Sequence, residues 1–545
     1  MKAAKKGIWG WTAATLGVLA VFCTWRPELG RKGQALIVLA GGTLTAVLLW
    51  IDREIRKKER KPEQIFLMLF IPISLAMMIA MPLFRVPDEA RHLGRIWQIS
   101  IGQWMPDDRN AGVFYQPVGL FEEDSTDMTL WQMAKTAGDS IDMARLEEAD
   151  VGAATGFYPI HNYFLQALGM ALVRLATKNR LAILYGARFG GWLATLLLTY
   201  YAVKKIPAGK YVVIAIALMP MFLQEAVSAS ADGITNAAAA AFLAMILEMR
   251  TQSEPLRKRQ YAEMFLLTFC ICTFKVFYCP LALLLAAIPP ERFAGGRKGK
   301  RRALAAVTAA ILAIIGLWAF ACLKNYVVPE AAEGNKIVDQ AKWMMRHPIQ
   351  YLAVLGGTIL DYFGTFIREM EGQSLSWYNI RLPSLVTSIQ ILMVALVASR
   401  DRRLKETDGI RKSIFLLSAV SVLAICTSLY VWWTPIGDSR ILGLQGRYFL
   451  PLLPGVLLAA IRKRDGARET NDAERTLMGL AMPDGMPTGV RAHSPAAGTI
   501  SWWNPNGRDS ISPLRRPTKA RTFSTPRTCA WWSISRNCWT PAWTV

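Results

Sequence analysis

Several signatures of soluble enzymes are missing from this chain. It contains no G-x-x-x-x-G-K-[ST], no G-x-G-x-x-G, no H-E-x-x-H and no G-x-S-x-G. ATP-phosphate loops, dinucleotide sites, zinc-protease helices and serine-hydrolase turns each depend on one of these spacings. ATP-driven transport, nicotinamide chemistry and zinc or serine hydrolysis therefore have no support in the sequence.

Charged residues, histidine and paired cysteines are also scarce. Only 19% of the residues are charged, there are four histidines, and the eight cysteines include no C-x-x-C. Most cysteines lie within apolar runs, where a thiol behaves as a small hydrophobe. His161 and His347 lack the spacing of metal ligands and stand where helices are expected to begin at a membrane surface. The sequence predicts neither a disulfide framework nor a metal site.

Apolar residues make up 53% of the chain and arrive in blocks. A helix of roughly 20 apolar residues crosses a bilayer. Eight blocks approach that length: 7–24, 34–51, 65–84, 181–203, 211–229, 303–322, 384–399 and 412–433. The first follows "MKAAKK" as a signal peptide would, but it lacks a small-x-small cleavage site, so we expect a retained anchor. The pattern indicates a polytopic membrane protein.

The net charge of +23 follows the expected membrane topology, and no nucleic-acid partner is predicted. Short basic runs such as "REIRKKERK" and "RKGKRR" separate the apolar blocks, and such runs stay in the cytoplasm. Residues 86–155 then lie outside, and they hold thirteen acidic residues against five basic ones. This threading places both termini in the cytoplasm.

The same threading sets the number of spans. "AEMFLLTFCICTFKVFYCPLALLLAAI" must leave and return, so we expect a hairpin of two short helices with Lys275 near its outer turn. Residues 156–177 and 350–368 are expected to lie on the outer surface as amphipathic helices. The fold class is therefore an all-α membrane helix bundle of about 12 spans.

Three parts of the chain differ in character. Residues 1–63 are predicted to form a transmembrane hairpin with a basic cytoplasmic linker, and residues 64–465 the main membrane domain. Residues 466–545 hold nine arginines, one lysine, eight prolines and six of the 19 tryptophans, with no regular periodicity. This composition is typical either of a disordered basic tail or of translation in a shifted reading frame.

The first outer loop opens with "PDEARHLGRIWQI", which favours a helix beginning after Pro87. At helical spacing Asp88, His92 and Arg95 share one face, which suits a helix with its polar side toward a cavity. Asp88 and Glu89 are candidate catalytic acids, and the alternative is that they only cap a surface helix.

A second acid and two cations are expected at the same membrane level. Asp232 lies in "SASADG", among small residues that let a substrate approach the backbone, or it caps the next helix. Lys275 and Arg447 are suited to a lipid phosphate, or they pair with Asp88, Asp232 or Asp438.

Six short motifs resemble, in order, the bacterial membrane family called domain of unknown function 2142. They are "PDEARHLGRIWQISIGQW", "FYPIHNYFLQALGMALVRL", "YGARFGGWLATLLL", "SASADGITNA", "TFKVFYCPLALLL" and "LQGRYFLPLLP". That family resembles the GT-C glycosyltransferases, including lipid-A aminoarabinose and protein mannosyl transferases. Its chain is expected to continue beyond "RYFLPLLP", where the unusual tail composition begins, and this favours the frameshift.

The resemblance implies an enzyme that moves a sugar from a polyprenyl-phosphate carrier to an envelope glycan or lipid acceptor outside the bacterial cytoplasmic membrane. Asp88 would be the base, with Glu89 beside it. Asp232 would orient the acceptor or a divalent cation. His92, Arg95, Lys275 and Arg447 would bind substrate, the last two at the donor phosphate. The alternatives are a flippase of lipid-linked glycans and a non-catalytic membrane scaffold.

Overall fold

The computed structural model describes residues 30–57, 60–104, 113–121, 128–150, 158–325, 337–401 and 405–460. These residues are mostly helical, which confirms the prediction of a helical membrane protein, and they include two small antiparallel hairpins. One pairs β1 (Val113–Val118) with β2 (Asp142–Asp150), and the other pairs β3 (Ser374–Leu375) with β4 (Ile380–Arg381). The predicted anchor at 7–24 and the tail at 466–545 lie outside the described residues.

Five described helices are long and apolar enough to cross a membrane. They are α3 (Pro62–Ala80), α8 (Arg180–Lys205), α11 (Asp232–Thr251), α13 (Gly296–Asn325) and α17 (Arg411–Trp432). A bent pair, α9 (Lys210–Ala217) and α10 (Pro220–Val227), makes six if it forms one span. The predicted count of about 12 spans is not confirmed.

The remaining helices are shorter or more polar. Four short segments are apolar: α7 (Phe164–Ala176), η3 (Val276–Ala287), α16 (Ser384–Arg400) and Gly446–Ala460, which joins η6 (Gly446–Leu452) to α18 (Leu453–Ala460). The others are α2 (Gly30–Lys57), α4 (Glu89–Ser100), α5 (Leu130–Lys135), η2 (Ile160–Asn162), α12 (Lys258–Phe274), η4 (Pro290–Arg292), α14 (Ile337–Arg346), α15 (Pro348–Glu371) and η5 (Lys405–Ile410).

Two breaks in helices place residues of the candidate site. The block at 211–229 was expected to be a single span, but α9 and α10 meet at 68°. Pro220 begins α10, and the extended Met219 before it interrupts the helix, as a residue preceding proline tends to do. The chain also breaks at Lys275, where a turn is expected: α12 ends at Phe274, Lys275 is extended, and η3 follows and packs against α12.

Helix α11 is the most enclosed of the candidate spans. Its most apolar stretch is 89% buried. Its sequence "NAAAAAFLA" consists mostly of residues with small side chains. Small residues let neighbouring helices approach closely within a membrane. Helix α8 packs against both α11 and α7. A Cβ added to Gly190 of α8 would lie 2.0 Å from the carbonyl oxygen of Leu165 in α7, so this crossing requires glycine.

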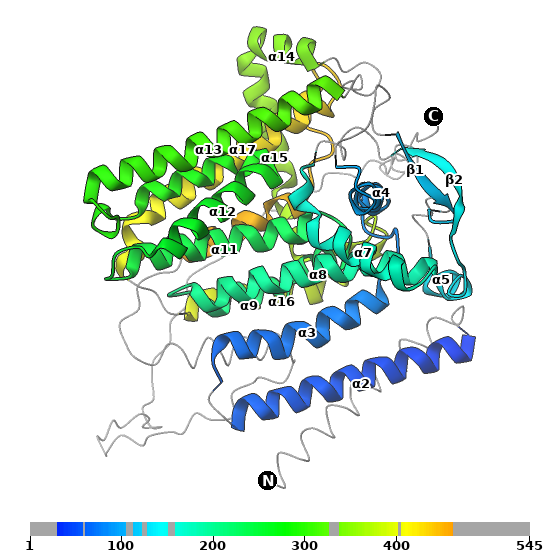
Figure 1. Ribbon diagram of the computed structural model, residues 1–545. Coiled ribbons are helices and arrows are strands. Elements are labelled where there is room, and N and C mark those ends of the chain that lie inside the picture. Colours follow the sequence, from blue (N-terminus) through cyan, green and yellow to red (C-terminus); the bar gives the residue numbers. More distant parts are fainter. Residues whose placement is uncertain are drawn as a thin grey trace, which may run out of the picture. The chain divides into compact units, whose positions relative to one another are not determined.

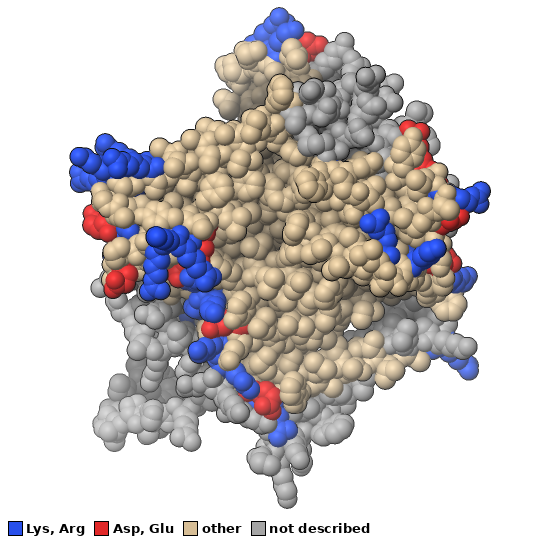
Figure 2. Space-filling view, in the orientation of Figure 1, with Lys and Arg blue, Asp and Glu red and all other residues tan. Residues whose placement is uncertain are grey.

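The helices form a stack with charged ends. Helices α2, α3, α8 and α11 lie side by side, each in contact with the next (Figure 1). Charged side chains gather toward opposite edges of the view in Figure 2, with a broad band of other residues between them. Helix α8 ends in Lys204 and Lys205, and α13 begins with the basic run "GRKGKRR". An uncharged band between charged edges is the surface expected of a membrane protein.

Candidate functional site

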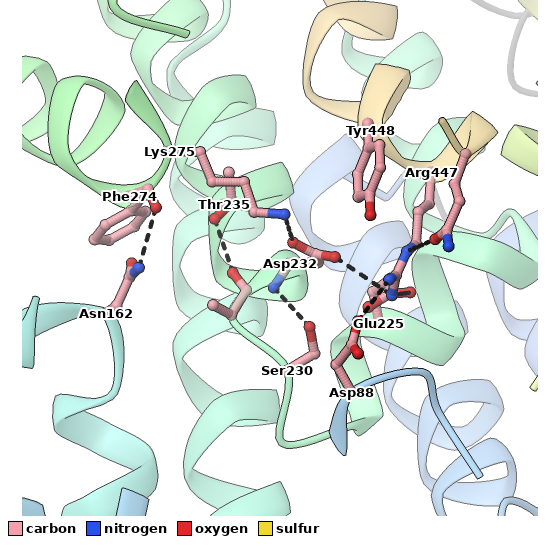
Figure 3. A network of polar contacts seen from close by, with 12 residues as sticks. Asp88, Asn162, Glu225, Ser230, Asp232, Thr235, Phe274, Lys275, Arg447 and Tyr448 are labelled. Carbon is pink, nitrogen blue, oxygen red and sulfur yellow. Dashed lines mark hydrogen bonds and ion pairs between the residues drawn. The ribbon is translucent and has the colours of Figure 1, made fainter. Parts of the chain in front are cut away.

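Five ionisable side chains meet at one end of the helix stack, and we call them the charged cluster: Asp88, Glu225, Asp232, Lys275 and Arg447 (Figure 3). Nη2 of Arg447 lies 3.3 Å from Oδ2 of Asp88, and its Nη1 lies 3.5 Å from Oε1 of Glu225 and 3.6 Å from Oδ2 of Asp232. Nζ of Lys275 forms an ion pair with Oδ1 of Asp232. The cluster therefore holds three carboxylates and two cations.

Breaks and ends of helices supply all five side chains. Asp88 immediately precedes α4, Asp232 is the first residue of α11, and Lys275 stands between α12 and η3. Glu225 lies in α10, and a Cβ on Gly233 would lie only 2.5 Å from its carbonyl oxygen. The small residues of "SASADG" thus allow the backbones of α10 and α11 to approach each other.

Asp88 does not cap its helix. It occupies the N-cap position with a left-handed backbone (φ 64°), yet no capping hydrogen bond from its side chain is found in the described residues. Its side chain is 47% exposed and faces Arg447. Asp232 does not cap α11 either, because Ala231 occupies the N-cap position and the Asp232 carboxylate faces Lys275 and Arg447. The capping alternatives for both acids are therefore wrong.

Glu89 lies outside the charged cluster although it follows Asp88 directly. It forms a completely buried ion pair with Arg188 of α8, with Nη2 2.7 Å from Oε2 and Nε 2.8 Å from Oε1. Its carboxylate also accepts hydrogen bonds from the backbone N–H groups of Phe84 and Ala229. With four donors around it, this carboxylate joins the segment between α3 and α4 to α8 and to the α10–α11 connection. We assign it a positioning role in place of the predicted catalytic one.

His92 and Arg95 lie further along the same helix. Nδ1 of His92 lies 2.6 Å from the hydroxyl of Tyr163, and burial lowers the pKa of His92 to about 4 although Asp88 and Asp232 oppose that shift. His92 is therefore neutral at pH 7 and flanks the cluster. Arg95 is buried and donates to Gln98 Oε1 and to the carbonyl of Trp104. These contacts hold α4 and the residues that follow it, so the structure does not bring Arg95 to the cluster.

Both predicted phosphate-binding cations already have carboxylate partners, which is the alternative that the sequence left open. The ring of Tyr448 lies beside both of them, with its centroid 5.1 Å from Lys275 Nζ and 5.4 Å from the guanidinium carbon of Arg447. Tyr278 donates a hydrogen bond to the Tyr448 carbonyl. Contact with an aromatic face stabilises a cation without neutralising it. An incoming anion would have to share these cations with Asp88, Glu225 and Asp232.

Several residues of the site carried no assignment at the sequence level. Glu225, Tyr448 and Arg188 are the main ones. Arg188 could have been suspected, because a charged residue in the middle of an apolar span nearly always has a partner inside the protein. Tyr448 follows Arg447 directly, and Glu225 belongs to a helix that the proline break turns toward the cluster.

Among the described residues, four other than glycine have positive φ, and all lie near the cluster: Phe84, Asp88, Ser376 and Tyr378. The β3–β4 hairpin holds the 84–88 turn, because Ser376 Oγ donates to the carbonyl of Arg85 and Trp377 Nε1 donates to that of Phe84. The N–H of Ser376 also donates to Gln224 of α10 at 2.6 Å. Left-handed backbone at residues other than glycine is unfavourable and gathers at functional sites.

The side chains of the charged cluster are poorly suited to bind a divalent cation. No group of three or more His, Cys, Asp or Glu side chains arranged to hold a metal ion occurs in the part of the chain that the structure describes. Asp232 already faces two cationic side chains, which would repel a metal ion at its carboxylate.

The fold and the charged cluster define a helical integral membrane protein with a polar site at the ends of its spans. Residues 69–456 of the 545 match the model of a family described as predicted membrane protein (DUF2142), so the chain belongs to that family, as its motifs predict. No curated protein and no solved structure matches the chain.

Proposed function

We propose that this protein is a glycosyltransferase that moves a sugar from a polyprenyl-phosphate carrier to an envelope glycan or lipid acceptor. The observation that carries the proposal is a half-exposed carboxylate, Asp88, held at the edge of a buried pair of cations, Lys275 and Arg447. A base that solvent and substrate can reach stands next to groups that stabilise a phosphate.

The chemistry needs few residues. Asp88 takes the proton of an acceptor hydroxyl while that oxygen attacks the anomeric carbon, and the bond from that carbon to the phosphate oxygen breaks. A phosphate leaves readily without an acid, so one base suffices together with cations that stabilise the departing charge. Lys275 and Arg447 supply that charge, and Asp232 keeps Lys275 in place. His92, neutral at pH 7, can contact sugar hydroxyls.

A flippase of lipid-linked glycan precursors is the second candidate. The enclosed position of α11 and the broken α9–α10 pair favour it, because transporters bind their substrates at interrupted helices. A flippase would move the intact lipid-linked glycan without breaking the bond between the sugar and the phosphate. The product therefore separates the two functions.

The proposed site of action is the outer face of the bacterial cytoplasmic membrane, with both termini in the cytoplasm. The basic ends of α8 and α13 support this orientation, since basic loops stay inside. Residues 128–150 then lie outside, with the exposed Asp139 among them.

The test is complementation of a strain that lacks the gene, with Asp88→Asn compared against Asp139→Asn. Asp88→Asn keeps the shape of the side chain but removes the base, so we expect at least a hundredfold loss of sugar transfer from labelled polyprenyl-phosphate sugar to the envelope acceptor. Asp139→Asn should transfer at the wild-type rate. Envelope glycan analysis should show the same sugar missing from the deletion strain and from the Asp88→Asn strain.

Full transfer by Asp88→Asn would remove Asp88 as the base. In the deletion strain, accumulation of the intact lipid-linked precursor on the inner leaflet would favour the flippase instead. A separate labelling experiment tests the orientation. A thiol reagent that cannot cross the membrane should label the Asp139→Cys variant and not the Lys298→Cys variant; the reverse pattern would invert the orientation.

A further inference from the structure

The four buried side chains of the charged cluster are balanced in charge, two negative and two positive, and the half-exposed Asp88 adds one negative charge at the edge. The cluster contains three carboxylates and two cations, and four of these five side chains are at least 88% buried: Arg447 is 4% exposed, Glu225 0%, Asp232 12% and Lys275 9%. An uncompensated charge removed from water is strongly unfavourable. A negative charge that a ligand adds to this site would be uncompensated, so its entry favours the uptake of one proton.

Glu225 is the carboxylate with the weakest support. Its Oε1 has only the 3.5 Å contact with Arg447, and its buried Oε2 has no hydrogen-bond partner among the described residues. Asp232 has both Lys275 and Arg447, and water can reach the half-exposed Asp88. A proton taken up together with such a charge should therefore bind to Glu225.

Arg447 connects this proton to the occupancy of the site. The same guanidinium contacts Asp88, Glu225 and Asp232, so an anion that draws Arg447 toward itself weakens its contact with Glu225. Glu225 would then be a buried carboxylate with no cation beside it. Protonation is the least unfavourable response of such a group.

We propose that Glu225 is a proton-binding site coupled to anion binding: when a phosphodiester lipid engages Arg447 and Lys275, Glu225 takes up one proton from solution. It releases that proton when the anion leaves. The coupling rests on the proposed function for the identity of the anion, a polyprenyl phosphodiester with one fixed negative charge. Entry of that charge together with one proton leaves the net charge of the site unchanged.

The surroundings of Glu225 contain several other charged or titratable groups. Those that face it or its partner Arg447 are Asp88 before α4, Asp232 of α11, Lys275 after α12, Glu369 of α15, Tyr378 of the β3–β4 hairpin, and Tyr448 of η6. Glu369 accepts a hydrogen bond from the N–H of Gly446, so it has a partner of its own. Of the cluster's three acids, Glu225 alone is both fully enclosed and left with an unsatisfied oxygen.

The test is isothermal titration calorimetry of the purified full chain with a short-chain polyprenyl phosphoryl glucose, at several pH values and in two buffers of different ionisation enthalpy. A phosphodiester is the right probe because it does not titrate near neutral pH. We expect its affinity to fall as pH rises through neutrality, with a limit of about tenfold per pH unit for one proton. The buffer comparison should show uptake of up to one proton per bound probe.

Glu225→Gln is neutral at every pH, so it should bind the probe at high pH as tightly as the wild type does at low pH, with no proton uptake. Glu248→Gln, at the other end of α11 and paired with Lys205, is the matched control and should keep the wild-type slope. Size-exclusion profiles establish that each variant is folded.

Equal pH slopes in wild type and Glu225→Gln would overturn the coupling and leave the glycosyltransferase proposal intact. Absence of probe binding at every pH would overturn the coupling as well, because it removes the anion site. Glycan analysis of the deletion strain then decides separately whether the chain is a transferase.

Discussion

Asp88 and Glu89 are neighbours in the sequence, and they belong to two different kinds of charged structure. Glu89 and Arg188 are completely buried, close and surrounded by hydrogen-bond partners. Asp88 belongs to a cluster in which the contacts of Arg447 are longer, one member is half-exposed and one oxygen is unsatisfied. The first arrangement holds the backbone in one place, and the second leaves contacts that a ligand can replace.

The completeness of pairing and hydrogen bonding, more than charge itself, separates a structural ion pair from a functional one. A fully paired carboxylate has no free capacity to accept a proton or a ligand. Groups that are incompletely paired are less stable, and this is why they can exchange partners during a reaction.

The largest effect should come from breaking the buried pair. Arg188→Met leaves Glu89 charged and buried without a cation, and removal of one partner from such a pair costs about 3–5 kcal/mol. We expect the variant to fail to accumulate in the membrane, or to lose most of its thermal stability in detergent. Fluorescence-detected size-exclusion chromatography after heating measures this.

The double variant Glu89→Leu, Arg188→Met is the control for that experiment. It removes both charges, so it should recover part of the lost stability. Recovery should be incomplete because Arg188 also donates to the carbonyls of Met81 and Pro82. Wild-type stability of Arg188→Met would show that the pair is not structural.

A smaller effect should come from acidification at His92. Burial lowers the pKa of His92 to about 4 from its ordinary 6.5, so the unfolded chain binds a proton more readily between these values. Stability should therefore fall as pH drops from about 6.5 to about 4, by at most about 1.4 kcal/mol per pH unit from this residue. Thermal unfolding midpoints measured across that range would show the loss.

His92→Gln cannot titrate and should have a shallower acid profile than the wild type. Burial also lowers the pKa of His161 to about 4. His161 should therefore account for much of the pH dependence of stability that remains in His92→Gln, and His161→Gln tests this contribution. An unchanged profile in His92→Gln would mean that this face of α4 is open to water, as the charged cluster is at Asp88.

The smallest effect concerns the left-handed backbone of the hairpin beside the cluster. Ser376→Ala and Ser376→Gly both remove the hydroxyl that donates to Arg85, but only glycine relieves the positive φ of 59°. Ser376→Gly should therefore be more stable than Ser376→Ala by about 1 kcal/mol. Equal melting temperatures would contradict this cost.

That four of the charged residues lie together could be predicted from the charge pattern of the chain. Basic runs placed Asp88, Asp232, Lys275 and Arg447 on one face, and the structure brings these four together. Their pairing could not be predicted, because it depends on how far each helix extends and where it bends. Glu225 reaches the cluster only because Pro220 redirects α10.

The class of protein and the end of the helices at which polar residues gather follow from the order of the amino acids. The length of apolar runs and the charge of the loops are local properties that directly determine how a chain inserts into a bilayer. Only the tertiary structure decided which of two adjacent carboxylates is committed to Arg188 and which faces Arg447. Successive residues entering a helix point about 100° apart, so each carboxylate meets whatever other segment the fold brings to its side.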